Sequence, residues 1–144
     1  SFGAAYGPTT RENSIAILNT MRDLGMDHFD TAFIYAGGEA EAIFGEYCAQ
    51  SASARDFFTV ATKGGIYRGD PSANDGFPNN NTRAFLTEQL DASLARLRRD
   101  CVDLYYLHRW DQRLPIEAVM ETLADLLEQN SKELALYECG QADY

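Results

Sequence analysis

The chain has 144 residues, of which 45% are hydrophobic and 12% aromatic, a composition typical of one soluble domain with a single hydrophobic core. Its formal net charge is −10, and its 12 lysines and arginines are scattered among 22 acidic residues, which argues against binding to nucleic acid. No apolar run reaches the roughly 18 residues of a membrane-spanning helix, and the N-terminal segment lacks a signal-peptide pattern, so we expect a cytoplasmic location and no membrane partner.

The first predicted element in chain order is a helix of about four turns. Thr9 and Glu12 have the spacing of a capping box, and Gly25 is expected to end the helix. One face of this helix carries Ile15, Leu18, Met21 and Leu24. Residues 26–30 (MDHFD) then predict a short strand, and residues 39–50 (EAEAIFGEYCAQ) a second helix.

The apolar, β-branched run FFTVAT at 57–62 predicts a strand that is buried on both faces. Residues 64–81 are dense in Gly, Pro, Asn and Asp, which indicates an irregular loop long enough to be a lid or a disordered excursion. We expect Thr82 to cap the next helix. Its leucine stripe predicts a core face, and three arginines in its last turns favour the negative end of the helix dipole: Leu86, Leu90, Leu94 and Leu97, then Arg96, Arg98 and Arg99.

Residues 101–108 (CVDLYYLH) predict a further strand, and Pro115 suits the first turn of an amphipathic helix over 116–129. A last short strand is predicted at 134–138. Helices and strands therefore alternate along the chain, which predicts right-handed crossovers and a parallel sheet covered by helices. With no internal repeat and no interdomain linker, residues 1–144 are expected to form a single domain.

The cysteines predict neither a disulfide framework nor a metal site. Cys48, Cys101 and Cys139 are far apart, and none stands at metal-ligand spacing from His28 or His108. We therefore expect reduced cysteines and no bound metal.

Reactive side chains stand where the predicted strands end. Asp30 ends the first full strand, Lys63 follows the second and His108 ends the third, while Tyr35 lies in the loop just after Asp30. Each has an ordinary structural explanation when it is taken alone, such as a turn residue or a packed aromatic. The carboxyl ends of parallel strands share one face, however, and sites are built there, so the four residues together predict a functional site.

The chemistry of such a set is acid–base chemistry. An ammonium next to a tyrosine favours the phenolate and lowers the phenol's pKa from about 10, and a carboxylate keeps that ammonium charged and oriented. A neutral imidazole can position a carbonyl oxygen, and proton transfer of this kind contributes roughly a hundred- to ten-thousand-fold in rate. None of the four residues supplies a reductant, so a cofactor must bring the hydride.

Four segments, in this order and spacing, resemble the aldo-keto reductases: FDTAFIYAGGEAEAIFGE, TVATKGG, VDLYYLHRWD and PIEAVMETLADLLEQ. The resemblance runs from about residue 3 to 129. It implies a parallel (β/α) barrel of the TIM type and reduction of aldehydes or ketones with NADPH or, less often, NADH. By resemblance Tyr35 is the general acid, Lys63 lowers its pKa, Asp30 pairs with Lys63 and lies close to the nicotinamide ribose, and His108 orients the substrate carbonyl.

The chain also departs from the family pattern. Ala36 stands where the family usually has glycine, and after Gln129 the resemblance weakens, with Tyr137 where a smaller residue would meet the nicotinamide amide. A full barrel takes about 250 residues, so we expect a truncated, roughly half barrel that lacks most of the cofactor site. Two exposed sheet edges would then favour self-association.

Two functions remain open on these residues. The first is the N-terminal portion of an NADPH-dependent reductase that acts on a small carbonyl substrate, with activity impaired in the truncated chain. The second is a non-catalytic aldo-keto reductase remnant that serves as a binding or accessory module. A doubly wound nucleotide-binding fold is disfavoured, because no GxGxxG or GxxxxGK motif follows a predicted strand.

Overall fold

The protein is described by a computed structural model that covers residues 2, 9–69, 71–74 and 78–136, with the side chains from residue 127 onward left undescribed. Helices and strands alternate as the sequence predicts. The elements in chain order are α1 (Arg11–Asp23), β1 (His28–Asp30), the 3-10 turn η1 (Tyr35–Gly38), α2 (Glu39–Cys48), α3 (Ala52–Phe57), β2 (Thr59–Gly64), η2 (Pro71–Asn74), α4 (Arg83–Leu97), β3 (Val102–Leu107), α5 (Ile116–Asn130) and β4 (Ser131–Leu136).

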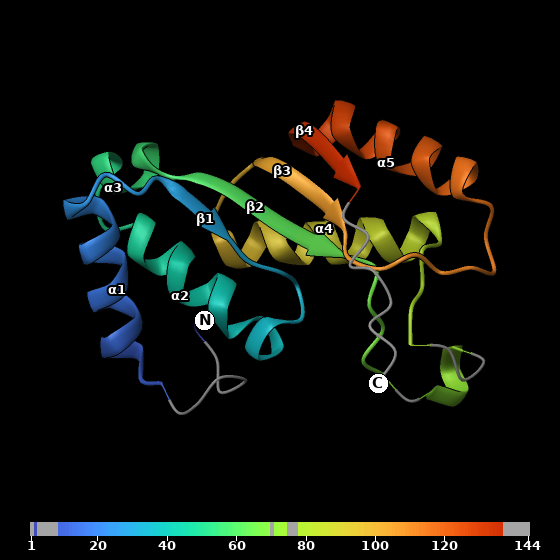
Figure 1. Ribbon diagram of the computed structural model, residues 1–144, viewed down its shortest axis with the longest axis horizontal. Helices are drawn as coiled ribbons and strands as arrows, with labels where there is room; N and C mark the ends of the chain where they lie inside the picture. The colour runs from blue at the N-terminus through green and yellow to red at the C-terminus, as the bar shows by residue number, and fades with distance from the viewer. Residues whose placement is uncertain (1, 3–8, 70, 75–77, 137–144) are drawn as a thin grey trace.

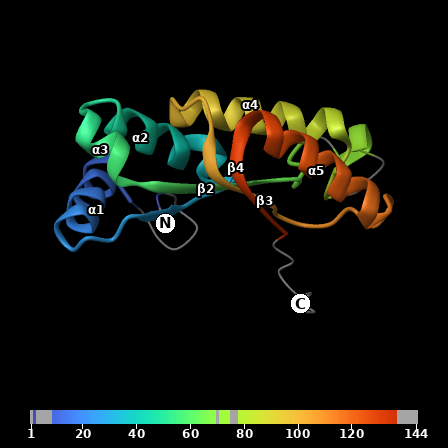
Figure 2. The ribbon, with the colours of Figure 1, turned by 90° about the horizontal axis from the view of Figure 1, so that it is seen from above.

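The four strands form one sheet in the order β1-β2-β3-β4, and every neighbouring pair is parallel. Figure 1 shows the strands side by side, and Figure 2 shows α2 and α4 along one face of the sheet. Helix α4 packs against both α2 and α5. Because every neighbouring pair is parallel, all carboxyl ends lie along the same edge, as in a stretch of parallel α/β barrel.

The core lies between the sheet and these helices. The four leucines of α4, spaced at Leu86, Leu90, Leu94 and Leu97, are all buried in it, which confirms the predicted core stripe. Strand β2 is buried from Val60 to Gly64, as expected for a strand covered on both faces. Gly45 lets α2 approach α4 closely, because a Cβ there would overlap the backbone of Arg96 and Leu97.

Helix α3 was not predicted. Ser51 caps it by accepting a hydrogen bond from the Ala54 amide at 3.1 Å, and the helix runs to Phe57, so that β2 begins only at Thr59. The apolar pair Phe57–Phe58 hid this boundary, because an apolar run of this length fits a buried strand as well as the end of a short helix.

The predicted helix caps need correction. The N-cap of α1 is Thr10, whose side chain accepts from the Asn13 amide at 3.2 Å, and not Thr9. Thr82 does stand at the N-cap of α4, but its hydroxyl donates to Asn80 Oδ1 at 2.8 Å and makes no capping bond to the helix. The helix thus begins with an interaction that belongs to the preceding loop.

The C-terminal elements differ from the prediction in extent. Strand β4 starts at Ser131, directly after α5, three positions earlier than predicted, and Leu136 is its last residue. Tyr137 lies outside the described residues.

The arginines predicted to interact with the dipole of α4 have separate contacts. Arg96 pairs with Glu41, and Arg99 pairs with Asp103, while Arg98 ends α4 at φ 54°.

The loop after β2 has more regular structure than its composition indicates. Its described part contains η2 and an isolated antiparallel bridge between Ile66 and Asn79. The Asn80 amide also donates to the Gly65 carbonyl at 2.9 Å, so the two ends of this loop are held together. Among all described residues, no helix is long and apolar enough to cross a membrane.

Candidate functional site

The backbone of β1 and β2 places Asp30 next to Lys63. Asp30 is the last residue of β1, and the ladder continues beyond it because the Thr31 amide donates to Ala61 and the Phe33 amide to Lys63. Lys63 is the next-to-last residue of β2 and so lies within the strand, one position beyond its predicted end. The shared strand ends thus bring a carboxylate and an ammonium together at the carboxyl edge of the sheet.

The Lys63 ammonium is the centre of the cluster. Its side chain is 5% exposed, and it donates to the Asp30 carboxylate and, at 2.8 Å, to the Thr31 carbonyl. The ammonium also lies 5.2 Å from the centroid of the Tyr35 ring and 5.6 Å from that of Tyr106. Two oxygen acceptors and two aromatic faces compensate the loss of water around a buried ammonium.

Tyr35 reaches the site from η1, directly after the β1 extension. Its amide donates to the Ala32 carbonyl at 3.0 Å, and the next three residues, Ala36, Gly37 and Gly38, all have positive φ. Ala36 stands at φ 52°, ψ 33°, the left-handed conformation that glycine adopts without steric cost. Tyr35 itself remains 38% exposed at the edge of the site.

His108 follows β3 directly and meets Tyr35 at a right angle. The two rings lie 5.8 Å apart at an interplanar angle of 83°, and the His108 amide donates to the Gly64 carbonyl at 2.7 Å. Burial lowers the pKa of His108 to about 4, with further lowering by the Lys63 and Arg109 charges and partial compensation by Asp30. The imidazole is therefore neutral at physiological pH, and its buried Nδ1 has no hydrogen-bond partner within the described residues.

A buried ion pair packs against the loop that carries Tyr35. Glu41 in the first turn of α2 is fully buried, accepts from the Thr62 hydroxyl at 2.6 Å and pairs with Arg96 of α4 at 3.0 Å. The Arg96 guanidinium also lies 4.5 Å from the centroid of the Phe33 ring. Sequence reasoning missed this pair, because its partners are 55 positions apart and each has an ordinary helical neighbourhood.

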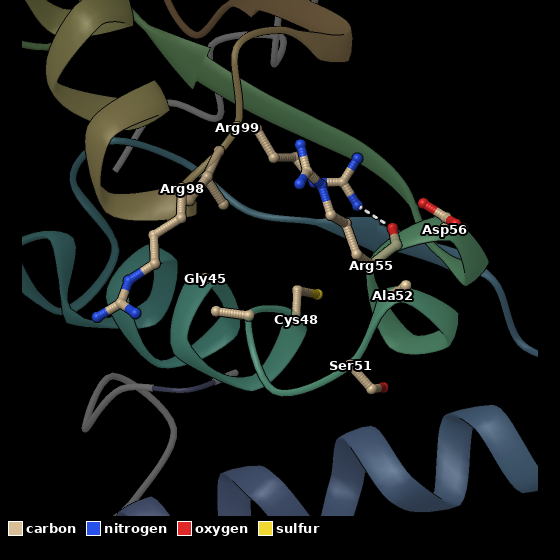
Figure 3. Close-up of a pocket in the computed structure, with 10 residues that line it drawn as sticks. Gly45, Cys48, Ser51, Ala52, Arg55, Asp56, Arg98 and Arg99 are labelled. Carbon is tan, nitrogen blue, oxygen red and sulfur yellow. Dashed lines mark hydrogen bonds between the residues drawn. The ribbon is translucent and has the colours of Figure 1, made fainter.

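A hollow of about 470 Å³ is lined by residues of α2, of α3 and of the end of α4 (Figure 3), and none of the four cluster residues lines it. Cys48, Arg55 and Arg99 are among the residues that line it. Arg99 donates to the Arg55 carbonyl at 2.7 Å and to the Phe58 carbonyl at 3.2 Å, which ties the C-terminal end of α3 to the start of β3. Burial raises the pKa of the Cys48 thiol, so this cysteine stays protonated and unreactive.

The structure therefore brings together all four residues that the sequence singled out. A buried ammonium, a partly exposed carboxylate, a phenol and a neutral imidazole share one corner of the sheet, a set suited to proton transfer and to binding of a polar oxygen. No group of histidine, cysteine or acidic residues within the described part of the chain is arranged to hold a metal ion.

Known proteins resemble the chain in both sequence and structure. An aldo-keto reductase of Schizosaccharomyces pombe whose name carries NADP(+) is 35% identical over 138 residues, covering 95% of this chain and 40% of the relative. A probable voltage-gated potassium channel subunit beta of Arabidopsis thaliana is 37% identical over 108 residues, covering 75% and 31%. The structure of an aldo-keto reductase from Bacillus halodurans in its holo form superposes with a TM-score of 0.76 at 25% identity, covering 92% and 43%.

These matches identify the sheet as part of the reductase barrel. The parallel strands and their helices correspond to an α/β portion of the (β/α)8 barrel. The chain spans about a third of the length of the curated relatives that it matches, from 31% to 40%. The model of the aldo/keto reductase family matches residues 1–129, which include every residue of the cluster. By this match the chain belongs to the aldo/keto reductase family.

Proposed function

We propose that the chain carries the proton-donating corner of an NADP-dependent oxidoreductase that reduces aldehyde or ketone carbonyls to alcohols. The observation that supports this most directly is the position of the Lys63 ammonium, which contacts the Asp30 carboxylate and lies 5.2 Å from the Tyr35 ring. A positive charge at that place favours the phenolate that forms when a tyrosine gives up its proton.

Each residue has a separate role in this proposal. Tyr35 donates the proton to the carbonyl oxygen, and Lys63 stabilises the negative charge that remains on the phenol oxygen. Asp30 keeps the ammonium charged and oriented. His108, neutral and edge-on to Tyr35, binds the carbonyl oxygen and so places it within reach of the phenol.

The corner fits the reacting end of a nicotinamide cofactor. The Asp30 side chain is 44% exposed although it pairs with Lys63, so one side of the carboxylate remains available to a ribose hydroxyl. When bound, NADPH supplies the hydride to the carbonyl carbon, which together with the proton from Tyr35 yields the alcohol and NADP⁺. The name of the relative from Schizosaccharomyces pombe favours NADP over NAD.

A second function has one specific point in its favour. A relative that matches 75% of this chain is named as a probable voltage-gated potassium channel subunit beta. In that alternative the chain is a binding or accessory module, and the polar corner is retained without turnover.

Cofactor binding and turnover separate the two functions. Titration with NADPH, followed by nicotinamide fluorescence, is expected to show weak but saturable binding, and a nitrobenzaldehyde is expected to be reduced at a low rate, because the chain covers only part of the barrel. Tyr35→Phe removes the proton donor and should abolish turnover while cofactor affinity stays nearly unchanged. Tyr47→Phe is the matched control, because its hydroxyl bonds Asn19 at 2.8 Å in another part of the fold.

Full activity in Tyr35→Phe would contradict the catalytic role of Tyr35. Absence of NADPH binding by the 144-residue chain would favour the accessory module.

Two further expectations belong to the same proposal. The first is a cytoplasmic location, tested by cell fractionation. The second is self-association of this chain through the edges of β1 and β4, tested by sedimentation velocity. A monodisperse monomer would contradict the second.

A further inference from the structure

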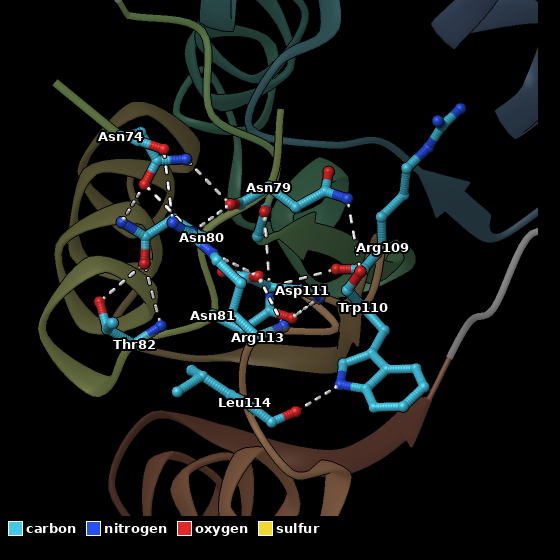
Figure 4. A network of polar contacts seen from close by, with 11 residues as sticks. Asn74, Asn79, Asn80, Asn81, Thr82, Arg109, Trp110, Asp111, Arg113 and Leu114 are labelled. Atoms are coloured by element: carbon cyan, nitrogen blue, oxygen red, sulfur yellow. Dashed lines mark hydrogen bonds and ion pairs between the residues drawn. The ribbon is translucent and has the colours of Figure 1, made fainter. Parts of the chain in front are cut away.

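The loops that follow β2 and β3 are joined through one buried side chain, that of Asn81 (Figure 4). Asn81 is 1% exposed and lies just before α4, at the end of the long loop after β2. Its amide nitrogen donates to the Arg109 carbonyl at 3.1 Å and lies 3.5 Å from the Gly65 carbonyl. Its amide oxygen accepts from the Asp111 amide.

These contacts involve the residues that stand next to the proposed catalytic groups. Gly65 is two positions after Lys63, and Arg109 is the residue after His108. Since the His108 amide donates to the Gly64 carbonyl at 2.7 Å, Asn81 adds a second connection between the same two strand ends. His108 is thereby held on both sides, by its own amide and by the carbonyl of the next residue.

The backbone at Gly65 is shaped to admit this side chain. Gly65 has φ +107°, and a Cβ there would lie 2.8 Å from Asn81 Nδ2. The Gly65 amide donates to the buried Gln89 side chain at 2.7 Å, which fixes the same turn from α4. A side chain at Gly65 would therefore disturb the bond from Asn81 to the Arg109 carbonyl.

The far side of Asn81 is anchored as well. The Asp111 carboxylate accepts from Arg113 Nε at 2.8 Å, and Arg113 in turn donates to the Asn79 carbonyl at 3.0 Å and to Asn74 Oδ1 at 3.3 Å. The described part of the long loop is thus joined to residues 109–113 by a polar network with Asn81 at its buried end. Hydrogen bonds between buried groups, such as those of Asn81, rigidify the segments that they connect.

We propose that Asn81 is a positioning residue that holds His108 against Lys63 and Tyr35 at the carboxyl edge of the sheet. The proposal deepens the proposed function, because it concerns the same site, but it makes a separate statement about the geometry of the chain without cofactor or substrate. Asn81 acts through the backbone that directly follows His108 and through Gly65, and it does not touch the reacting atoms. Without it, residues 109–111 would loosen and His108 would turn toward water.

The charges around His108 make this movement measurable. Burial is the main cause of its low pKa, and Lys63, Arg109 and Asp30 are the charged groups that act on it. The chain has only two histidines, so the His108 signal is readily distinguished from that of the exposed His28. NMR titration of the two imidazole Cε1 protons between about pH 8 and 5.5 brackets the ordinary histidine pKa of about 6.5.

In the wild-type chain the His108 signal is expected to stay constant over this range. In Asn81→Ala the His108 signal should begin to titrate, with its pKa raised by at least about one unit, a tenfold change in its protonation constant. Asn81→Leu, which fills more of the vacated volume without a donor, should behave in the same way. An unchanged His108 signal in a folded Asn81 variant would overturn the proposal.

Val119→Ala is the control for a general loss of stability. Val119 is a buried core residue of α5 without a place in the polar network, so its truncation should destabilise the fold and leave the His108 titration unchanged. If Val119→Ala shifted the His108 pKa as far as Asn81→Ala does, general loosening would account for the effect and the proposal would be wrong.

A measurement on the wild-type chain keeps the test decisive if the Asn81 variants do not fold. The His108 amide, bonded to Gly64, and the Asp111 amide, bonded to Asn81, should show matching protection from hydrogen exchange, because both open when the two loops separate. Rapid exchange at Asp111 with strong protection at His108 would contradict the role of Asn81. None of these measurements uses NADPH or turnover, so failure of the proposed function would leave their result readable.

Discussion

Lys63 and Asp30 form an asymmetric pair: the lysine side chain is 5% exposed and the aspartate side chain 44%. The ammonium is thus enclosed by protein, while its counter-ion faces the solvent at the edge of the sheet. The two oxygen acceptors and the enclosure hold the ammonium in place, and the carboxylate is the exposed member of the pair.

Replacing Lys63 tests how strongly its charge affects the pKa of His108. Lys63→Met removes the ammonium but keeps most of the side-chain volume, and because the Lys63 charge lowers the pKa of His108, we expect that pKa to rise. Burial remains, so the value should stay below the ordinary 6.5 or so. NMR titration of His108 measures the shift. Arg109→Gln should raise the pKa less, and a larger effect of the Arg109 change than of the Lys63 change would contradict this prediction.

The low pKa of His108 also predicts a pH dependence of stability. The folded state holds a neutral imidazole down to about pH 4, whereas the unfolded chain binds a proton near 6.5, so the unfolded state binds more protons between these values. Stability from this residue is present above pH 6.5 and is lost as the pH falls toward 4. After allowance for partial solvent exposure, the loss is on the order of 1–2 kcal/mol.

Urea unfolding of the wild-type chain and of His108→Asn at neutral pH and at about pH 5 isolates this contribution. The wild-type chain should lose more stability between the two pH values than the variant does, because the other titrating groups are common to both. Equal losses in the two proteins would show that His108 is not buried in its neutral form.

At position 36 we expect glycine to be tolerated and a β-branched residue to destabilise the fold. Its left-handed conformation costs an alanine about 1–2 kcal/mol, whereas glycine adds roughly 0.5–1 kcal/mol of entropy to the unfolded state. Ala36→Gly should therefore leave the free energy of unfolding unchanged or raise it by up to about 1 kcal/mol. Ala36→Val should lower it by more than about 1 kcal/mol. Destabilisation by glycine, measured in urea, would argue against the positive φ at this position.

We expect substitutions of Glu41 and Arg96 to have strongly non-additive effects on the free energy of unfolding. Arg96→Met leaves the fully buried Glu41 carboxylate without its cation, which should cost about 3–5 kcal/mol in the free energy of unfolding. The double variant Glu41→Leu/Arg96→Met removes both charges and leaves only the Thr62 hydroxyl unpaired, at about 1–3 kcal/mol.

A double-mutant cycle in urea provides the measurement. The double variant is expected to be more stable than Arg96→Met alone. If it were less stable, the pair would not be isolated from water, and its support of the Tyr35 loop would have to come from the packing of Arg96 on Phe33 instead.

Several features of the fold could be predicted because their signals are local. The spacing of the leucines in α4 and the continuous apolar run of β2 each indicate a buried face, and both are buried in the structure. Helix α3 could not be predicted in the same way, since its capping serine precedes only a single turn or two and its end merges with the apolar start of β2.

The site likewise combines residues whose position could be predicted from local signals with contacts that could not. Asp30, Lys63 and His108 could be placed at one edge from the sequence, because the carboxyl ends of consecutive parallel strands meet there, and Tyr35 followed from its place just after Asp30. The contacts that hold these residues could not be read in advance. Asn81 and Glu41 lie in segments with a turn-like or helical composition, and their partners are far away along the chain.

The sequence by itself therefore determined the alternation of helices and strands, the core stripe and the identity of the polar corner, because each depends on residue type and local spacing. Only the tertiary structure decided the enclosure of Lys63, the neutrality of His108, the left-handed backbone at Ala36 and the connection through Asn81. These depend on burial and on hydrogen bonds between loops, which exist only once distant segments are packed together.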